Sequence, residues 1–138
     1  MKLVRENINE KFTEDSDPIE DIGIGSKHLI HKWFDSVGVD RSRYTIDDDL
    51  NIYFRGNLDL QRTRITKLPN NLKVGGWLNL EGTSIRELPD NLRVKGGLNL
   101  QRTQITKLPD NLRVGGYLDA RETQIKKFPR HLAKEKII

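Results

Sequence analysis

Hydrophobic and polar positions along the chain recur with a period of twenty residues. Three rows align without gaps: TRITKLPNNLKVGGWLNLEG from Thr63, TSIRELPDNLRVKGGLNLQR from Thr83 and TQITKLPDNLRVGGYLDARE from Thr103. A partial fourth row, TQIKKFPRHL, begins at Thr123, and a degenerate row over 43–62 ends in GNLDLQR. A fixed period of this length is typical of a solenoid, in which each row is one coil and at least three coils stack to bury a core.

Each row predicts a short strand at its L-x-L step, because apolar residues alternate there with period two. The prolines at 69, 89, 109 and 129 fix the backbone just after an apolar position and so predict a corner. Glycine pairs at 75–76, 96–97 and 115–116 predict sites where close approach or a positive φ excludes a Cβ. The columns expected to point inward are Leu58/Leu60, Leu78/Leu80, Leu98/Leu100 and Leu118/Ala120; Ile65, Ile85, Ile105 and Ile125; Leu68, Leu88, Leu108 and Phe128; Leu72, Leu92, Leu112 and Leu132; and Val74, Val94 and Val114.

A helix is predicted over 26–37, ahead of the repeats. Ser26 is a suitable N-cap and Gly38 a suitable stop. Its apolar residues recur at helical spacing on one face and are Leu29, Ile30, Trp33, Phe34 and Val37. Because a solenoid exposes the end of its core, an amphipathic helix at this place is expected to cap it. The segment 44–60 that follows predicts a strand pair leading into the first regular coil.

The predicted organisation is one mainly β solenoid domain over 26–138, with about four coils of twenty residues. It comprises the capping helix 26–37, the degenerate coil 43–62, the regular repeats 63–132 and a tail 133–138. Residues 1–25 are expected to be an acidic, mobile leader, because FTEDSDPIEDIGIG combines many carboxylates with a proline.

The pattern L-x-L-x-x-T-x-I-x-x-L-P over about 50–132 resembles the leucine-rich repeat family in its short bacterial form. That form is familiar from secreted bacterial ubiquitin-ligase effectors, and the rows are more similar still to small repeat proteins encoded by bacteriophages. The resemblance implies an α/β leucine-rich-repeat-like solenoid that acts as a binding scaffold. The leader resembles one found ahead of other small phage proteins, which implies an address or docking segment.

Two departures from the family change what the resemblance implies. Threonine stands at 63, 83, 103 and 123 where the family usually has asparagine, so the ladder between coils is expected to be less complete and the coil to turn differently. The effector ligases also carry a catalytic domain with a cysteine nucleophile. This chain has no cysteine, so ligase activity does not carry over.

The composition narrows the class of protein further. Without cysteine there is no disulfide framework and no thiolate metal site. No apolar run approaches the about 18 residues that a membrane span needs, and charges interrupt the N-terminus where a signal peptide would be apolar. We therefore expect a cytoplasmic protein without membrane contact, located in the host cell or the virion if phage-encoded.

Charge is divided unevenly between the two parts of the chain. Residues 1–50 hold seven Lys/Arg and twelve Asp/Glu, whereas 51–138 hold seventeen and eight. A basic body raises nucleic acid or an acidic protein surface as a partner. The alternative is solubility together with attraction between the two parts.

The outward side of the strand ladder is the predicted protein-binding face. Two aromatic side chains among short polar groups are typical of a protein interface. The alternative is that Trp77 covers bare backbone at Gly97. The residues of this face are Asn57, Asp59, Gln61, Trp77, Asn79, Glu81, Gly97, Asn99, Gln101, Tyr117, Asp119 and Arg121.

Lys73, Arg93 and Arg113 form a basic column that is a candidate for phosphate contacts. Like charges stacked in register could equally serve solubility, and the chain has no nucleic-acid motif and no run of aromatics among these cations. Lys67, Glu87 and Lys107 alternate in sign, which predicts pairing across coils.

No cofactor, metal or catalytic residue is predicted. His28, His31 and Asp35 lie on one helical face, but a fourth metal ligand is missing and His31 and Asp35 could form an ordinary helix pair. The run 47–49 lacks the spacing of a calcium loop and predicts a solvated turn. There is no Gly-rich phosphate loop, HExxH motif or nucleophile elbow.

The sequence thus favours a non-enzymatic module that binds a protein through the strand face. The first alternative is a nucleic-acid or polyanion binder, which salt would distinguish. The second is a structural or virion-associated protein addressed by its leader. The last coil is expected to end in an open edge protected by Asp119, Arg121 and Glu122, so we predict a monomer or a weak homodimer.

Overall fold

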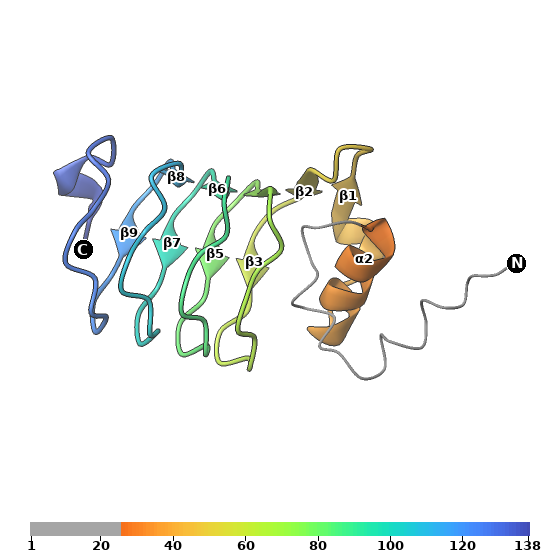
Figure 1. The fold of residues 1–138 in the computed structure, drawn as a ribbon, viewed down its shortest axis with the longest axis horizontal. Coiled ribbons are helices and arrows are strands. Elements are labelled where there is room, and N and C mark those ends of the chain that lie inside the picture. The colour runs from red at the N-terminus through yellow and green to blue at the C-terminus, as the bar shows by residue number, and fades with distance from the viewer. Residues whose placement is uncertain (1–25) are drawn as a thin grey trace, which may run out of the picture.

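A computed structural model describes residues 26–138, and the predicted leader 1–25 lies outside this part. Helix α2, Lys27–Ser36, precedes the coils, which confirms the predicted helix (Figure 1). Ser26 is its N-cap, with the Oγ accepting a hydrogen bond from the His28 N–H at 3.0 Å. The chain leaves the helix at Gly38, whose φ of 77° is readily adopted only by glycine. Within 26–138, no helix is long and apolar enough to cross a membrane.

Helix α2 packs its aromatic side chains onto the first strands. A 3-10 turn, η2 (Arg41–Arg43), leads into β1 (Tyr44–Ile46), which pairs antiparallel with β2 (Ile52–Phe54). This is the predicted strand pair. The Phe34 ring stacks on Tyr44 with 4.0 Å between centroids, and it lies 6.2 Å from Phe54. Phe34 and its neighbour Trp33 are fully buried, so the helix closes the N-terminal end of the core as expected.

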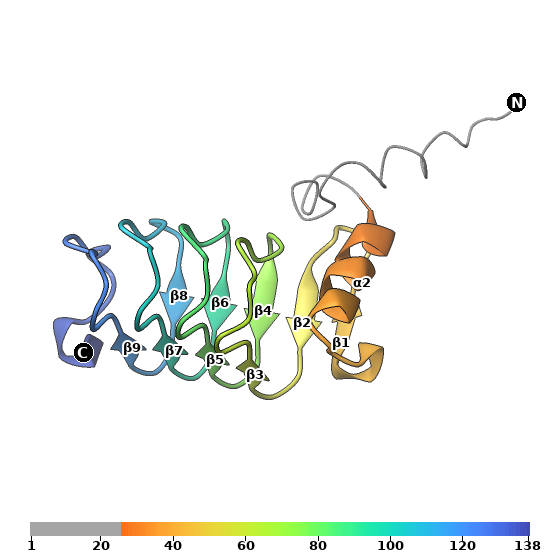
Figure 2. The same cartoon turned by 90° about the horizontal axis from the view of Figure 1, so that it is seen from below.

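The rest of the chain winds into a mainly β solenoid of about three turns with a twenty-residue spacing (Figures 1 and 2). One parallel sheet continues from β2 through β4 (Leu72–Val74), β6 (Arg93–Val94) and β8 (Arg113–Val114). The other contains β3 (Leu58–Asp59), β5 (Leu78–Asn79), β7 (Leu98–Asn99) and β9 (Leu118–Asp119). Every pair of parallel strands from β2 to β9 joins residues twenty apart, so the sequence period is the register of both sheets.

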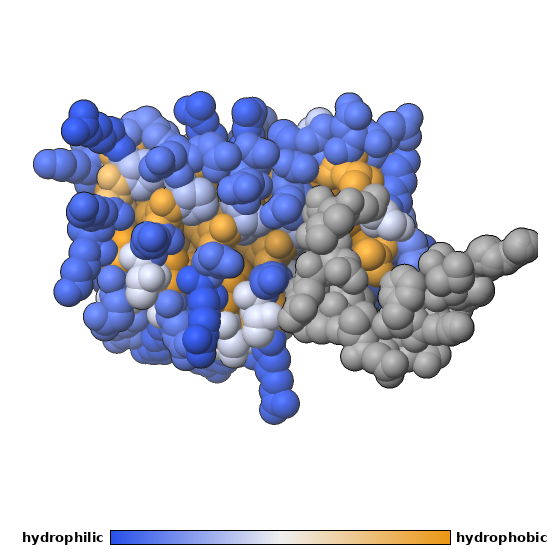
Figure 3. All heavy atoms as spheres, viewed as in Figure 1, coloured by the Kyte–Doolittle hydropathy of each residue, from blue (hydrophilic) through white to orange (hydrophobic). Residues whose placement is uncertain are grey.

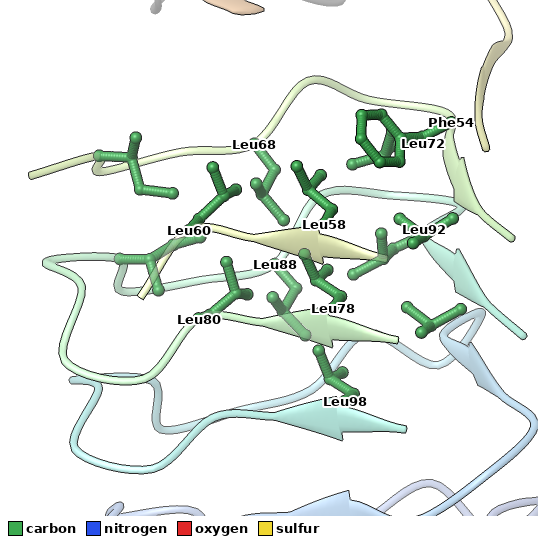
Figure 4. Close-up of a cluster of buried hydrophobic side chains, with 14 of the residues drawn as sticks. Phe54, Leu58, Leu60, Leu68, Leu72, Leu78, Leu80, Leu88, Leu92 and Leu98 are labelled. Carbon is green, nitrogen blue, oxygen red and sulfur yellow. The ribbon is translucent and has the colours of Figure 1, made fainter. Parts of the chain in front are cut away.

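The core lies between the two sheets and is built from the predicted inward columns. Leu58, Leu78 and Leu98 point inward from successive strands and meet leucines from the opposite side of the coil (Figure 4). Polar side chains cover the rims of the coils, with apolar surface showing between them (Figure 3). The columns become half-buried in the last coil, at Leu108, Val114, Ala120, Ile125, Phe128 and Leu132. Within 26–138, there is no further coil past the last of these residues to cover them.

The threonine column does not join adjacent coils. Each threonine hydroxyl donates to a carbonyl three residues earlier in its own coil, over 2.8 Å from Thr83 to Leu80 and over 2.8 Å from Thr103 to Leu100. The ladder between coils is instead formed by asparagine at another corner. Asn91 donates to Asn71 and Asn111 donates to Asn91, each over 2.9 Å.

The expectation of an open edge at the last coil is wrong for β9, whereas β8 is the last strand of its sheet. After the 3-10 turn η3 (Lys134–Lys136), the tail turns back along β9. The Ile138 N–H donates to the Leu118 carbonyl at 2.8 Å, and the Ala120 N–H donates to the Ile138 carbonyl at 3.0 Å. The backbone of the tail therefore covers the edge of β9, and Asp119, Arg121 and Glu122 are engaged in ion pairs.

Candidate functional site

The strand face is the outward surface of β3, β5, β7 and β9. The alternation of each strand places the leucines inward and their neighbours outward, so the predicted residues do lie on one surface. Asn57, Asp59, Trp77, Tyr117 and Arg121 are exposed, and the remaining members are half-buried. Those half-buried residues are Gln61, Asn79, Glu81, Gly97, Asn99, Gln101 and Asp119.

Four of these polar residues form a column that holds the turn after each strand. Their side-chain oxygens accept the backbone N–H two residues later, a short-range bond typical of Asn and Asp. The distances are 3.1 Å from Asp59, 3.0 Å from Asn79, 2.9 Å from Asn99 and 3.1 Å from Asp119. Because these oxygens serve the turn, the column positions the face more than it offers free groups to a partner.

Other polar groups of the strand face are also paired with their neighbours. The Asn57 Oδ1 accepts the Trp77 N–H at 2.9 Å. Arg121 forms an ion pair with Asp119 at 2.7 Å, and its hydrogen bonds lower the pKa of the Asp119 carboxyl. Glu81 contacts Arg102 at 3.2 Å. The strand face is therefore a rigid polar lattice from which the aromatic side chains project.

A hollow on this face lies between Trp77 and Tyr117. A shallow groove of about 320 Å³ runs over β5, β7 and β9, with Trp77 on one side, Gly97 in the middle coil and Tyr117 on the other. The two aromatic residues are 41% and 62% exposed. They stand two strands apart, which is about 10 Å along the ladder. Ile138 from the tail also lines the groove.

The basic column lies on the other sheet, where Lys73, Arg93 and Arg113 are in parallel register as predicted. A wider groove of about 680 Å³ follows it, and we call this the basic groove. Tyr53 extends the column at its N-terminal end, because β2 pairs Tyr53 with Lys73. Arg55 and Lys95 add a second row of cations two residues further along their coils.

The prediction missed Tyr53, Arg55 and Ile138 as parts of these surfaces. Tyr53 and Arg55 could have been predicted from the sequence, because a shift of twenty aligns them with Lys73 and Gly75. The degenerate composition of row 43–62 concealed that alignment. Ile138 gives no periodic signal, since its position depends on the tail turning back onto β9.

Two other groups of residues considered from the sequence, the helical one around His31 and the acidic run 47–49, form local contacts. The carboxylate of Asp35 pairs with Arg41 at 2.9 Å, and the His31 Nδ1 lies 2.7 Å from the Tyr44 hydroxyl, so neither faces a shared metal position with His28. No group of three metal-ligating side chains occurs between Ser26 and Ile138. Asp47 accepts hydrogen bonds from Asp49 and Asn51, as a turn does.

The predicted pairing of Lys67, Glu87 and Lys107 is wrong. The ion pairs found in the described part of the chain involve other residues, and on the coils they centre on Arg102 and Arg121. Arg102 bridges Glu81 and Glu122, at 3.2 and 2.6 Å. Its backbone is left-handed, with φ of 58°, at the turn that follows β7.

Comparison with known proteins gives no relative from which a function could be transferred. The chain has no significant match among protein-family models, curated proteins or solved structures.

Proposed function

We propose that this chain is a non-enzymatic repeat module of the leucine-rich-repeat type that binds a protein through its strand face. The observation that supports this most strongly is the groove between Trp77 and Tyr117. Two exposed aromatic residues flank a glycine on a surface where other polar side chains accept hydrogen bonds from the backbone.

The chemistry of the groove fits a protein partner. Aromatic side chains contribute more to protein interfaces than their number implies, because they bury a large area at a small cost in conformational entropy. Here both project from a hydrogen-bonded ladder, which limits the ordering that binding requires. Gly97 leaves space between them for an apolar side chain of the partner, and the surrounding polar lattice would form a rim that excludes water.

The experiment uses the full chain as bait in a lysate of the cells that express it. A captured protein is then purified and titrated against wild type and the double variant Trp77→Ala/Tyr117→Ala. We expect at least a hundredfold loss of affinity, since each aromatic anchor contributes about 2 kcal/mol. Both side chains are exposed, so the variant should keep its thermal transition.

Tyr53→Ala is the matched control, because it removes an aromatic of similar exposure from the other sheet. Its affinity for the partner should stay within about threefold of wild type. Equal binding by wild type and the double variant would refute the assignment to the strand face. The resemblance to small phage repeat proteins is tested separately, by asking whether the captured partner is a phage or host protein.

A further inference from the structure

The basic groove presents five cations on one face of the sheet formed by β2, β4, β6 and β8. Lys73, Arg93 and Arg113 stand in adjacent strands, about 4.8 Å apart. Arg55 and Lys95 lie on the same face, two residues further along. No carboxylate is among the residues that line this groove. Such clustering makes the electrostatic potential at the groove more positive than the net charge of the chain alone would make it.

These cations are not neutralised by ion pairs within residues 26–138. The salt bridges in that range use Lys27, Arg41, Arg102 and Arg121, all of them outside the basic groove. The Arg55 guanidinium donates to the Ser42 carbonyl, and Lys73 Nζ lies 3.4 Å from Asn51 Oδ1. Arg93, Lys95 and Arg113 have no side-chain hydrogen bond in this range and form the free centre of the cluster.

Tyr53 adds an aromatic face to this charged surface. Its side chain is 43% exposed, and Lys73 Nζ lies 5.2 Å from the centroid of its ring. Tyr53 is in direct register with Lys73, so the ring and the three cations of the column form one line across four strands. The line is about 14 Å long.

The floor of the groove is mostly apolar. In the second row, Gly75 lies between Arg55 and Lys95, and Gly115 follows Lys95. Val74 and Val94 lie beneath the row. The glycines leave hollows beside the charged side chains. A ligand that lies here therefore meets cations along its length, an apolar floor and one aromatic ring at the end.

We infer that the basic groove binds single-stranded nucleic acid, with phosphates on Arg93, Lys95 and Arg113 and an unpaired base stacked on Tyr53. A cationic channel with an aromatic platform is the combination that single strands use, because every base has a flat face to stack. A duplex has no free base for Tyr53. An acidic peptide would use the cations but gain little from the ring.

This inference is independent of the proposed protein-binding function, which uses the opposite sheet. The probes are a fluorescein-labelled oligo(dT) and an oligo(U) of ten nucleotides, titrated with the full chain by fluorescence anisotropy at several salt concentrations. Wild type should bind at low salt and weaken steeply as salt rises. Absence of binding at low salt would overturn the inference.

The charge variant is Arg93→Gln/Arg113→Gln, and both side chains are exposed. It should weaken binding at least tenfold and reduce the salt slope by about 1.4, the value for two lost phosphate contacts on a single strand. The matched control is Lys126→Gln/Lys127→Gln, which removes the same charge from an exposed corner outside the groove. Equal weakening by both variants would show attraction to net charge alone and overturn the assignment.

The aromatic variant is Tyr53→Ala, which should weaken binding about tenfold with an unchanged salt slope, because stacking involves no counterion release. Tyr53→Phe keeps the ring and should restore wild-type binding. Labelled poly-glutamate is the competing ligand. If it binds as tightly as the oligonucleotides and Tyr53→Ala has no effect on either, the groove is an acidic-protein site and the inference fails. Trp77→Ala/Tyr117→Ala should bind the oligonucleotides like wild type.

Discussion

Asn91 lies between Asn71 and Asn111 and is bonded to both. Its Nδ2 donates to Asn71 Oδ1 at 2.9 Å, and its Oδ1 accepts from Asn111 Nδ2 at 2.9 Å. Asn71 and Asn91 also share a left-handed backbone, with φ of 62°. Asparagine tolerates that conformation better than most residues, so the same side chain serves the corner and the ladder.

Asn91→Ala should therefore lower the free energy of unfolding by about 2 kcal/mol. The variant loses two side-chain hydrogen bonds. It also puts alanine at a left-handed position, which alanine tolerates less well than asparagine because it has no polar side chain to bond locally. Urea unfolding followed by circular dichroism measures the change. Gln104→Ala is the control, since that exposed side chain makes no hydrogen bond within 26–138, and it should change stability by less than about 0.5 kcal/mol.

Position 82 should respond to substitution in the opposite sense to position 62. Gly82 has φ of 71°, and the equivalent Arg62 has φ of 62°. Gly82→Ala should lower the free energy of unfolding by about 1 kcal/mol, whereas Arg62→Gly should raise it by a few tenths, because relief of the left-handed strain exceeds the added entropy of the unfolded chain. Denaturant midpoints of the two variants give both signs, and a loss at both positions would contradict the strain argument.

Phe34 is the side chain on which the helical cap depends. It is completely buried between helix α2 and the rings of Tyr44 and Phe54. Phe34→Ala should lower the free energy of unfolding by about 4 kcal/mol, as expected for a large side chain removed from a packed core. Lys32→Ala, on the exposed side of the same helix, should be nearly neutral. A small effect of Phe34→Ala would mean that the helix is not part of the cooperative unit.

Most of what could be predicted about the fold came from the twenty-residue period of the sequence. Leu78 and Leu98 could be placed because one alignment sets both their inward direction and their register. For Asn79 and Asn99, the alternation predicts the outward direction of the side chain. It does not predict that the side-chain oxygen accepts the backbone N–H two residues later. The end of the solenoid was predicted wrongly because the tail turns back and the Ile138 N–H bonds to the Leu118 carbonyl. The tail is not part of the repeat, so the period gives no signal for this contact.

The same reasoning explains what was missed at the two grooves. Tyr117 is recognisable as exposed from its row alone. The groove between Trp77 and Tyr117, however, forms because the coil between them has Gly97 at the same position. Predicting it requires comparing three rows. Tyr53 belongs to the basic groove only because the irregular first row keeps the register of the later ones.

Acid should destabilise the protein through the contact between His31 and Tyr44. Burial, with a smaller contribution from Arg41, lowers the pKa of His31 below its ordinary value of 6.5. Burial raises the pKa of the Tyr44 phenol, and its hydroxyl lies 2.7 Å from His31 Nδ1. The folded state therefore favours the neutral imidazole, while the unfolded state takes up a proton near pH 6.5.

The stabilising contribution of His31 is thus fully present above pH 6.5 and is lost as the pH falls from 6.5 through the lowered pKa of the folded state. Unfolding free energies measured in urea from pH 7.5 to 4.5 should decline through this window in wild type. His31→Gln should flatten the decline, and His28→Gln, on an exposed position of the same helix, should leave it in place. The pKa values of Asp47 and Asp119 are lowered below 3.8, so the loss of their charges belongs to more acidic solutions. A decline that persists unchanged in His31→Gln would refute this assignment.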